Sequence, residues 1–349
     1  MSYPRLLPAF VAFFLGIILI IPALFLILPL WFIPLLLKTV KSWKTRMSKL
    51  EDIIQFDQAL GWRSKPNIKT WMELDGEYRV TTGEDGWRGN YSLKDCNTVV
   101  IGDSFVFGQG VSDKNHFASH TNSAKVKPLG SHGYGATQYL ILLKNLGNEI
   151  KGKLVIWFIF TGNDYREAIR PTSYGRHSPF VFYDNTTKSY KIRPENINPR
   201  KLPFNFEKGY STSMPELADL YYKNYFSDYA FGAFEYLAEE AKKHCEIHGA
   251  TFAITTIPLW WVHDEKAVRK VKRYCSNEEK FSPSYPDQKS EEICKSYDIS
   301  FCSGAHFYQR ADFLPNDFHW SRLGNKTAAK IIDKLHLSFL EKKKDKQKS

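Results

Sequence analysis

The sequence has little cysteine and no recognisable metal-binding motif. Its 349 residues include five cysteines, an odd number, and no two of them have CxxC or zinc-ligand spacing. This excludes a zinc finger and a disulfide-rich secreted scaffold. We expect isolated, mostly buried thiols, and a disulfide such as Cys275–Cys294 stays open because sequence does not determine connectivity. Neither a metal nor a cofactor is expected.

The chain also lacks a strongly basic character outside two short segments. Lys and Arg number 48 and Asp and Glu 37, which gives a net charge of +11. Segments 38–49 and 341–349 carry +5 and +3 of that charge. The remainder is nearly neutral, so we expect no nucleic-acid partner. Hydrophobic residues at 43% and charged residues at 24% are ordinary globular values, which exclude a disordered chain, a collagen and a coiled coil.

Charge is absent from residues 6–37, an apolar run of 32 residues. About 20 apolar residues span a bilayer, and this run is too long for the apolar part of a cleaved signal. We therefore predict that residues 1–37 anchor the chain in the lipid bilayer of an inner or plasma membrane. Prolines interrupt the helical hydrogen bonds, so the anchor is either one kinked transmembrane span or a re-entrant hairpin bending near Pro22.

The charges around the apolar run leave its orientation open. Only Arg5 precedes it, whereas the basic segment 38–49 follows it, which by the positive-inside rule favours a cytoplasmic body. Long domains cross membranes largely regardless of such charges, and basic residues can instead bind anionic headgroups. The sequence therefore does not decide on which side of the membrane the body lies.

Beyond residue 95, short apolar runs alternate with segments of helical periodicity. Runs that are apolar throughout are typical of strands buried on both faces, as parallel strands are. Their alternation with helices predicts an α/β fold, a three-layer sandwich with a parallel, flavodoxin-like sheet. The predicted strands are 98–101, 124–129, 154–160, 250–257 and 299–302, and the predicted helices are 137–146, 228–248 and 321–340.

These patterns divide the chain into an anchor and a body. Within the body, the segment rich in Tyr, Phe, Pro and Asn is either a lid or carbohydrate platform over a site, or a small subdomain that packs its aromatics on the sheet. The predicted parts are an anchor (1–37), a basic linker (38–50), a lead-in of strands and turns (51–95), a catalytic domain (96–340) with the aromatic insert (166–228), and a basic tail (341–349).

Reactive side chains follow several of the predicted strands. Ligands of doubly wound sheets bind at the carboxyl ends of the strands, where Ser104 and Asn163 would lie. His319 stands before the last predicted helix, and Asp317 lies two residues earlier. A serine needs an adjacent base to act as a nucleophile, and an acid that holds the other ring nitrogen of that base fixes its tautomer. The four residues therefore suit acyl transfer.

The order of these residues resembles the SGNH (GDSL-type) superfamily of esterases and acyltransferases, in particular its membrane-anchored bacterial type. The matching stretches are IGDSFVFGQGV (101–111), Gly133 with Tyr134-Gly135, Gly162-Asn163-Asp164 and DFHWSRLGN (317–325). The resemblance implies that Ser104 is the nucleophile and His319 the base. It implies an oxyanion hole formed by Ser104, Gly133 and Asn163.

Two positions depart from the family pattern or leave a choice. Many members place the acid three residues before the histidine, where this chain has Asn316, so Asp317 is favoured and Asn316 is the alternative. Gly135 is nearly as good a candidate for the oxyanion hole as Gly133. His116, His120 and His132 lie near the same loops, but no metal-ligand spacing links them.

We expect a serine esterase or O-acyltransferase that acts through an acyl-enzyme on an ester, with an acetylated glycan as the first substrate class. The glycan rests on the family resemblance and the expected anchor. A lipid ester is the next candidate. The competing class is a non-catalytic membrane protein that keeps the fold as a binding or assembly module. Sequence does not distinguish a water acceptor from a sugar acceptor.

Overall fold

The computed structural model describes residues 47–173, 175–193 and 214–348, and of the last three of these only the backbone. Residues 48–349 form one compact unit, separate from residues 1–47. The predicted anchor and residues 38–46 of the predicted linker therefore lie outside the described residues, as does the part of the insert from 194 to 213. Within the described ranges, no helix is long and apolar enough to cross a membrane.

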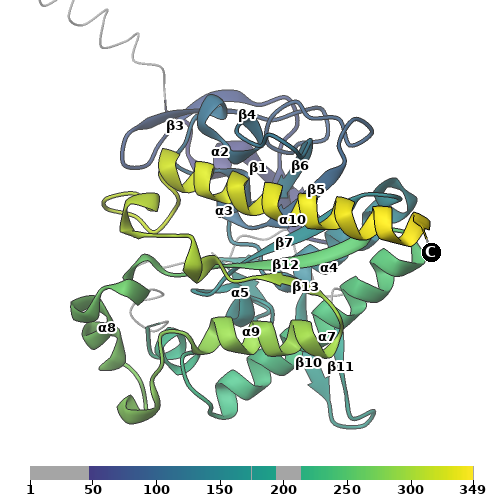
Figure 1. The fold of residues 1–349 in the computed structure, drawn as a ribbon. Coiled ribbons are helices and arrows are strands. Elements are labelled where there is room, and N and C mark those ends of the chain that lie inside the picture. Colours follow the sequence, from purple (N-terminus) through teal and green to yellow (C-terminus); the bar gives the residue numbers. More distant parts are fainter. Residues whose placement is uncertain (1–46, 174, 194–213, 349) are drawn as a thin grey trace, which may run out of the picture. The chain divides into compact units, whose positions relative to one another are not determined.

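A five-stranded parallel sheet forms the centre of the unit (Figure 1). Every side chain of β7, with the sequence LVIWFIF, is buried, as expected for a strand covered on both faces. The strand order across the sheet is the flavodoxin-like order 2-1-3-4-5, so the prediction of a parallel α/β sheet is confirmed. In spatial order the strands are β6 (Val126–Gly130), β5 (Thr98–Gly102), β7 (Leu154–Phe160), β12 (Thr251–Ile257) and β13 (Ser300–Cys302).

Helices cover both faces of this sheet (Figure 1). The long helix α10 (Arg322–Lys348) lies on one face, and α4 (Ala136–Leu146), α7 (Tyr225–Ile247) and α9 (Tyr285–Ser296) lie on the other. Residues 341–348, predicted as a basic tail, continue α10. Lysine is a good helix former and is favoured near helix C-termini, which explains the extension.

Two antiparallel hairpins form the lead-in, and they reach the loops at the sheet's carboxyl edge. They consist of β1 (Ile54–Asp57) with β2 (Gly61–Ser64) and of β3 (Lys69–Glu73) with β4 (Glu77–Thr81), after the short helix α2 (Leu50–Ile53). The buried Trp62 donates its indole N–H to the carbonyl of His132 at 2.8 Å, and Tyr134 donates its hydroxyl to the carbonyl of Trp62. The lead-in therefore holds the loop that follows β6.

The described part of the aromatic insert is a pair of small hairpins. They consist of β8 (Thr172–Ser173) with β9 (Arg176–His177) and of β10 (Phe180–Asp184) with β11 (Ser189–Arg193). The ring of Tyr190 lies 5.8 Å from that of Tyr229 and 6.5 Å from that of Tyr236, both on α7, which begins before the predicted end of the insert. Tyr190 of the insert thus packs on helix α7, whereas the subdomain prediction named the sheet. Part of the predicted lid lies on residues that the structure does not describe.

All five cysteines are buried and free, so the open pairing Cys275–Cys294 is not formed. Burial raises the pKa of Cys294 above its usual value, and that of Cys245 to about 12, so both thiols stay protonated. Protonated thiols in apolar surroundings behave as small hydrophobic side chains. The expectation of isolated, buried thiols is therefore confirmed.

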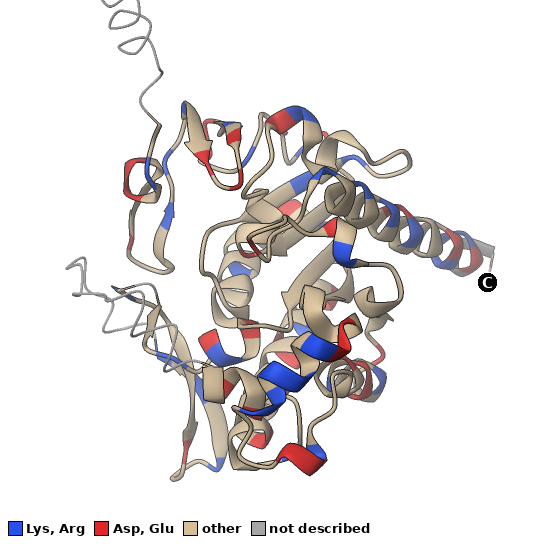
Figure 2. Cartoon of the chain, turned by 90° about the vertical axis from the view of Figure 1, so that its left-hand side faces the viewer, with Lys and Arg blue, Asp and Glu red and all other residues tan. Residues whose placement is uncertain are grey.

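Charges of both signs are interspersed over the domain (Figure 2). Two helical segments are basic: the end of α10 (341–348) and helix α8 (Glu265–Lys272), which follows β12 and carries Lys266, Arg269, Lys270 and Lys272. Only Arg269 among these has an ion-pair partner in the described chain, Glu265 at 3.6 Å.

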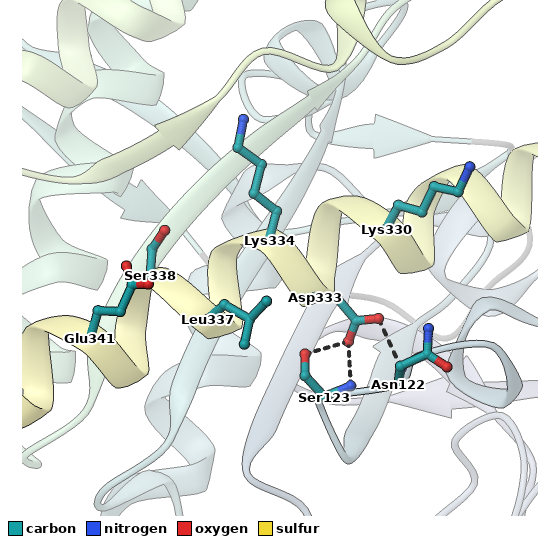
Figure 3. A pocket seen from close by; sticks show the side chains of 8 residues that line it. All are labelled: Asn122, Ser123, Lys330, Asp333, Lys334, Leu337, Ser338 and Glu341. Atoms are coloured by element: carbon teal, nitrogen blue, oxygen red, sulfur yellow. Dashed lines mark hydrogen bonds between the residues drawn. The ribbon is translucent and has the colours of Figure 1, made fainter.

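A hollow lies between α10 and the loop before β6 (Figure 3). At its centre, the carboxylate of Asp333 accepts hydrogen bonds from the backbone N–H groups of Asn122, Ser123 and Ala124 and from the Ser123 hydroxyl, at 2.7–3.1 Å. These bonds attach α10 to the sheet edge. None of the predicted site residues lines this hollow.

Candidate active site

Ser104 and His319, 215 positions apart, are in direct contact. Ser104 is the first residue of α3 (Ser104–Phe107), directly beyond the end of β5, and His319 lies in the loop before α10. The Ser104 Oγ lies 2.7 Å from His319 Nε2, a hydrogen-bond distance. Ser104 is 7% exposed and His319 4%, so bulk water does not compete for this bond.

The other side of the His319 ring contacts Asp317. Nδ1 lies 2.5 Å from Asp317 Oδ1, and the backbone N–H of His319 donates to the same oxygen at 2.8 Å. An aspartate next to Nδ1 places the ring proton there, which leaves Nε2 free to accept from Ser104. Burial acts to raise the pKa of Asp317, but the hydrogen bonds from His319 outweigh it and hold that pKa below its usual value.

Aromatic rings fix the orientation of the imidazole. The centroid of the His319 ring lies 5.0 Å from that of Phe105 and 4.5 Å from that of Phe318. Phe105 in turn meets Trp320 edge-on at 5.0 Å. Because Phe105 follows Ser104 on α3, the element that carries the serine also contacts the histidine ring.

Asn316, the alternative acid position, does not contact His319. Its backbone N–H donates to Asp75 Oδ2 at 2.6 Å, and its Nδ2 donates to Asp75 Oδ1 at 2.7 Å. Asp75 lies in the turn between β3 and β4. Of the two positions considered from the sequence, the structure therefore joins Asp317 to the histidine and Asn316 to the lead-in.

The three candidate groups for binding an oxyanion occupy neighbouring loop positions. The backbone N–H of Ser104 lies at the start of α3, where Asp103 Oδ1 accepts from the N–H of Phe105 at 2.9 Å. Asn163 precedes α5 (Asp164–Glu167) beyond the end of β7, and its buried Oδ1 has no partner among the described residues. Gly133 has φ +70°, a conformation that favours glycine.

Gly135 differs from Gly133 in the use of its amide. The N–H of Gly135 donates to Gln138 Oε1 at 2.8 Å, as part of the start of α4. A Cβ at this position would lie 2.8 Å from Glu167 Cβ, so the glycine serves close packing. For the N–H of Gly133, no hydrogen bond to a described residue is found. Gly133 is therefore the better donor of the two.

Two buried carboxyl groups, Asp103 and Asp164, are the sequence neighbours of Ser104 and Asn163. Burial raises the pKa of Asp103 to about 6, against the opposing effects of the Phe105 N–H and His319. Burial and the nearby Asp103 raise the pKa of Asp164 well above its usual value. Asp164 Oδ2 accepts from the Phe160 N–H and the Tyr139 hydroxyl, each at 2.8 Å, and so holds the turn that carries Asn163.

The remaining histidines of these loops do not form a metal site. His116 Nε2 lies 3.0 Å from the carbonyl of Val106, which anchors the ring to α3. His132 is buried, with its ring 4.3 Å from that of Phe107. In the described part of the chain, no group of three His, Cys, Asp or Glu side chains could hold a metal ion.

The sequence did not point to three lead-in residues that support the site: Asp75, Trp62 and Arg88. The fully buried Arg88 donates to Asp113 Oδ1 at 2.8 Å and to the carbonyls of Arg79, Phe107, Gly108 and Val111. It thereby holds the C-terminal end of α3. The sequence offered one signal for Arg88, the segment Gly86-Trp87-Arg88-Gly89, and this segment predicts only a turn.

No protein-family model matches this chain, and no curated protein sequence matches it. Solved structures resemble it distantly. One is a carbohydrate acetylesterase family member from Sinorhizobium meliloti (TM-score 0.40, 12% identity, 70% of this chain and 99% of the other). Another is TesA (0.36, 10%, 65% and 91%). A third is a putative acylhydrolase from Bacteroides fragilis (0.38, 11%, 72% and 91%). At these TM-scores the likenesses define neither a family nor an activity for this chain.

Proposed function

We propose that the chain is a serine esterase with Ser104 as nucleophile, His319 as general base and Asp317 as the orienting acid. The observation that carries the proposal is the continuous chain of contacts from Ser104 Oγ through His319 to Asp317, at 2.7 and 2.5 Å. A serine acting merely as a helix cap would not require an imidazole at its hydroxyl. The buried, aromatic surroundings of the ring fit a preorganised base.

The proposed reaction has two steps. Ser104 Oγ attacks the ester carbonyl carbon while its proton passes to His319 Nε2, and the resulting imidazolium is stabilised by Asp317. Collapse of the tetrahedral intermediate breaks the bond to the alcohol oxygen, which takes the proton from Nε2. Water then attacks the acyl-enzyme carbonyl and gives a proton to Nε2. Collapse of this second intermediate breaks the bond to Ser104 Oγ, which takes the proton back from Nε2, and releases the acid.

The negative oxygen of each tetrahedral intermediate needs donors already in place. We assign the backbone N–H groups of Ser104 and Gly133 and the side-chain amide of Asn163 to this role. The Asn163 side chain makes no hydrogen bond with a described residue, so its Nδ2 donors stay available for the oxyanion. Loss of one such donor typically costs about 2.7–4 kcal/mol of transition-state stabilisation.

The substrate proposed first is an acetyl or other acyl ester of a glycan, and a lipid ester is second. The apolar run 6–37 supports an anchor at an inner or plasma membrane, which would hold the enzyme near either substrate. Transfer of the acyl group to a sugar hydroxyl instead of water uses the same residues. Assays of an activated acetate ester with and without a glycan acceptor distinguish transfer from hydrolysis.

A fluorophosphonate probe tests the proposal directly, because it reacts with an activated serine. We expect labelling of the wild-type chain and of Ser338→Ala, which removes an exposed serine on α10, but none of Ser104→Ala. Folding of each variant is checked by circular dichroism. Folded wild-type protein that stays unlabelled and hydrolyses no ester would favour the non-catalytic binding module.

A further inference from the structure

His132 is a buried histidine without hydrogen bonds. Its side chain is 6% exposed, and neither ring nitrogen has a partner among the described residues. Leaving such groups unpaired costs free energy unless a ligand or water satisfies them. Burial lowers the pKa of His132 to about 3, with smaller electrostatic effects from His319 and the neighbouring arginines, so the ring is neutral and offers one donor and one acceptor.

Arg176, on β9, is a half-buried cation without a bonded partner. Its guanidinium makes no hydrogen bond and no ion pair with a described residue, unlike Arg88, Arg166 and Arg170, which each meet a carboxylate. Burial lowers the pKa of Arg176, while the charge of Glu51 acts in the opposite direction. A guanidinium remains charged in proteins and presents a planar set of donors that fits carboxylate and phosphate oxygens.

Backbone contacts bring these two residues to the same place. Arg176 pairs across the β8–β9 hairpin with Ser173, whose hydroxyl donates to the carbonyl of Gly133 at 3.3 Å. The next residue, His177, has its carbonyl oxygen 2.4 Å from where a Cβ of Gly61 would lie. The β8–β9 hairpin therefore lies against β2 and the loop of His132 and Gly133, beside the proposed oxyanion hole.

The His132 ring also lies next to the serine helix. Its centroid is 4.3 Å from that of Phe107, which is one helical turn beyond Ser104 on α3. Residues three apart on a helix lie on the same side of it. The His132 ring thus lies beside α3, and neither His132 nor Arg176 has a task in the proposed acyl transfer.

We propose that Arg176 and His132 form a subsite that binds a negatively charged group of the substrate, a carboxylate or a phosphate. Arg176 supplies paired donors and the charge, and His132 supplies one further donor at the buried side. The inference rests on the proposed esterase function and narrows its substrate class to esters that carry an anionic group. The subsite is separate from the oxyanion hole, which holds only the charge that develops during reaction.

Three matched acetyl esters test this proposal: 4-acetoxybenzoate, 4-acetoxyphenyl phosphate and the neutral 4-acetoxybenzamide. Each kcat/KM is divided by the ester's spontaneous hydrolysis rate to remove differences in leaving group. We expect wild-type protein to prefer at least one anionic ester over the amide by 10-fold or more. The better of the two anions identifies the bound group as carboxylate or phosphate.

Arg176→Gln is expected to reduce this preference at least 10-fold, mainly through KM for the anionic ester. Arg176→Lys keeps the charge but not the paired donors. Its preference for the anionic ester should therefore lie between that of the wild-type protein and that of Arg176→Gln. Arg273→Gln, which removes an exposed positive charge beyond α8, is the matched control and should keep the preference. His132→Gln should lower the preference with a smaller effect than Arg176→Gln.

The outcomes separate the two proposals. Hydrolysis of none of the three esters contradicts the esterase function itself. Equal hydrolysis of all three by wild-type protein, or an equal loss on all three in Arg176→Gln, overturns the anionic subsite and leaves the esterase function standing. Should Arg176→Gln not fold, calorimetry with full-length Ser104→Ala decides: tight binding of 4-acetoxybenzoate but not of 4-acetoxybenzamide supports the subsite, and equal binding overturns it.

Discussion

Asp75 and Asn316, 241 positions apart, are joined by two hydrogen bonds of 2.6 and 2.7 Å. The first bond holds the backbone of Asn316 and the second its side chain. Because Asn316 directly precedes Asp317, the turn between β3 and β4 determines where the loop presents its carboxylate. The lead-in is thus part of the support of the proposed active site.

Asp75→Ala is expected to lower kcat by about 10-fold, since small displacements of a catalytic group reduce rates strongly. The free energy of unfolding should fall by only about 0.5–1.5 kcal/mol, because these bonds are exposed. Ester hydrolysis and urea unfolding measure the two effects. Glu77→Ala, an exposed acid on the same hairpin, is the control. Combining Asp75→Asn with Asn316→Asp restores a matched pair and should recover activity. If the double variant does not recover activity, Asp75 does not act through its hydrogen bonds to Asn316.

Asp317→Asn should reduce kcat by about 10⁴-fold with little loss of stability, because an amide oxygen neither fixes the tautomer nor stabilises the imidazolium as a carboxylate does. Steady-state hydrolysis and thermal unfolding provide the measurements. Asn316→Asp alone is the comparison variant, and it should not raise activity. Normal activity of Asp317→Asn would remove the orienting acid from the mechanism.

Arg88→Ala is expected to destabilise the fold by about 3–5 kcal/mol, since it leaves Asp113 and several buried carbonyls without their donor. The midpoint of urea unfolding reports this loss. Arg79→Ala removes an exposed arginine nearby and should change stability little. Similar stabilities of the two variants would contradict the role assigned to Arg88.

Asp103 should make stability depend on pH near pH 6. Burial raises its folded-state pKa to about 6, above the unfolded value, so the folded state holds its proton more tightly. The stabilisation is complete below the unfolded pKa and is lost as pH rises through about 6. Urea unfolding between pH 4 and 8 should show a loss on the order of 2–3 kcal/mol. Asp103→Asn keeps the helix cap and should flatten this dependence; an unchanged profile would assign it to other groups.

Removal of residues 1–37 should leave an active, monodisperse protein, because residues 48–349 form a compact unit with its own core. Size-exclusion chromatography and ester hydrolysis measure this outcome. Aggregation of a truncated chain that keeps its secondary structure would show that the apolar run packs on the body.

The five strands of the sheet and the helices α4, α7 and α10 were predictable because their signals are local, whereas α8 and α9 were not predicted. The buried run of β7 and the periodicity of α7 are contained in their own residues, and the predicted bounds differ from the observed ones by at most a few positions. The same holds for the buried cysteines. By contrast, α10 runs beyond its predicted end, because charged helix formers extend a helix without an apolar pattern to reveal it.

The candidate site was predictable only in part. Ser104 and Asn163 were proposed because parallel strands bring their carboxyl ends to one edge, so strand-end residues lie near one another whatever their separation in the chain. His319 was proposed from its spacing to Asp317 and the family resemblance, and its contact with Ser104 is seen only in the structure. Asp317 was already favoured over Asn316 from the sequence, and in the structure Asp317 contacts the ring while Asn316 contacts Asp75.

The amino-acid sequence by itself determined the parallel sheet and the set of polar groups at its edge, because apolar periodicity and the polar residues that follow each apolar run are local features of the chain. Only the tertiary structure decided which groups support them. Arg88 and Asp75 act across long separations, through directional hydrogen bonds that exist only once the lead-in has packed on the domain, and the same packing brings the β8–β9 hairpin of Arg176 to the loop of His132.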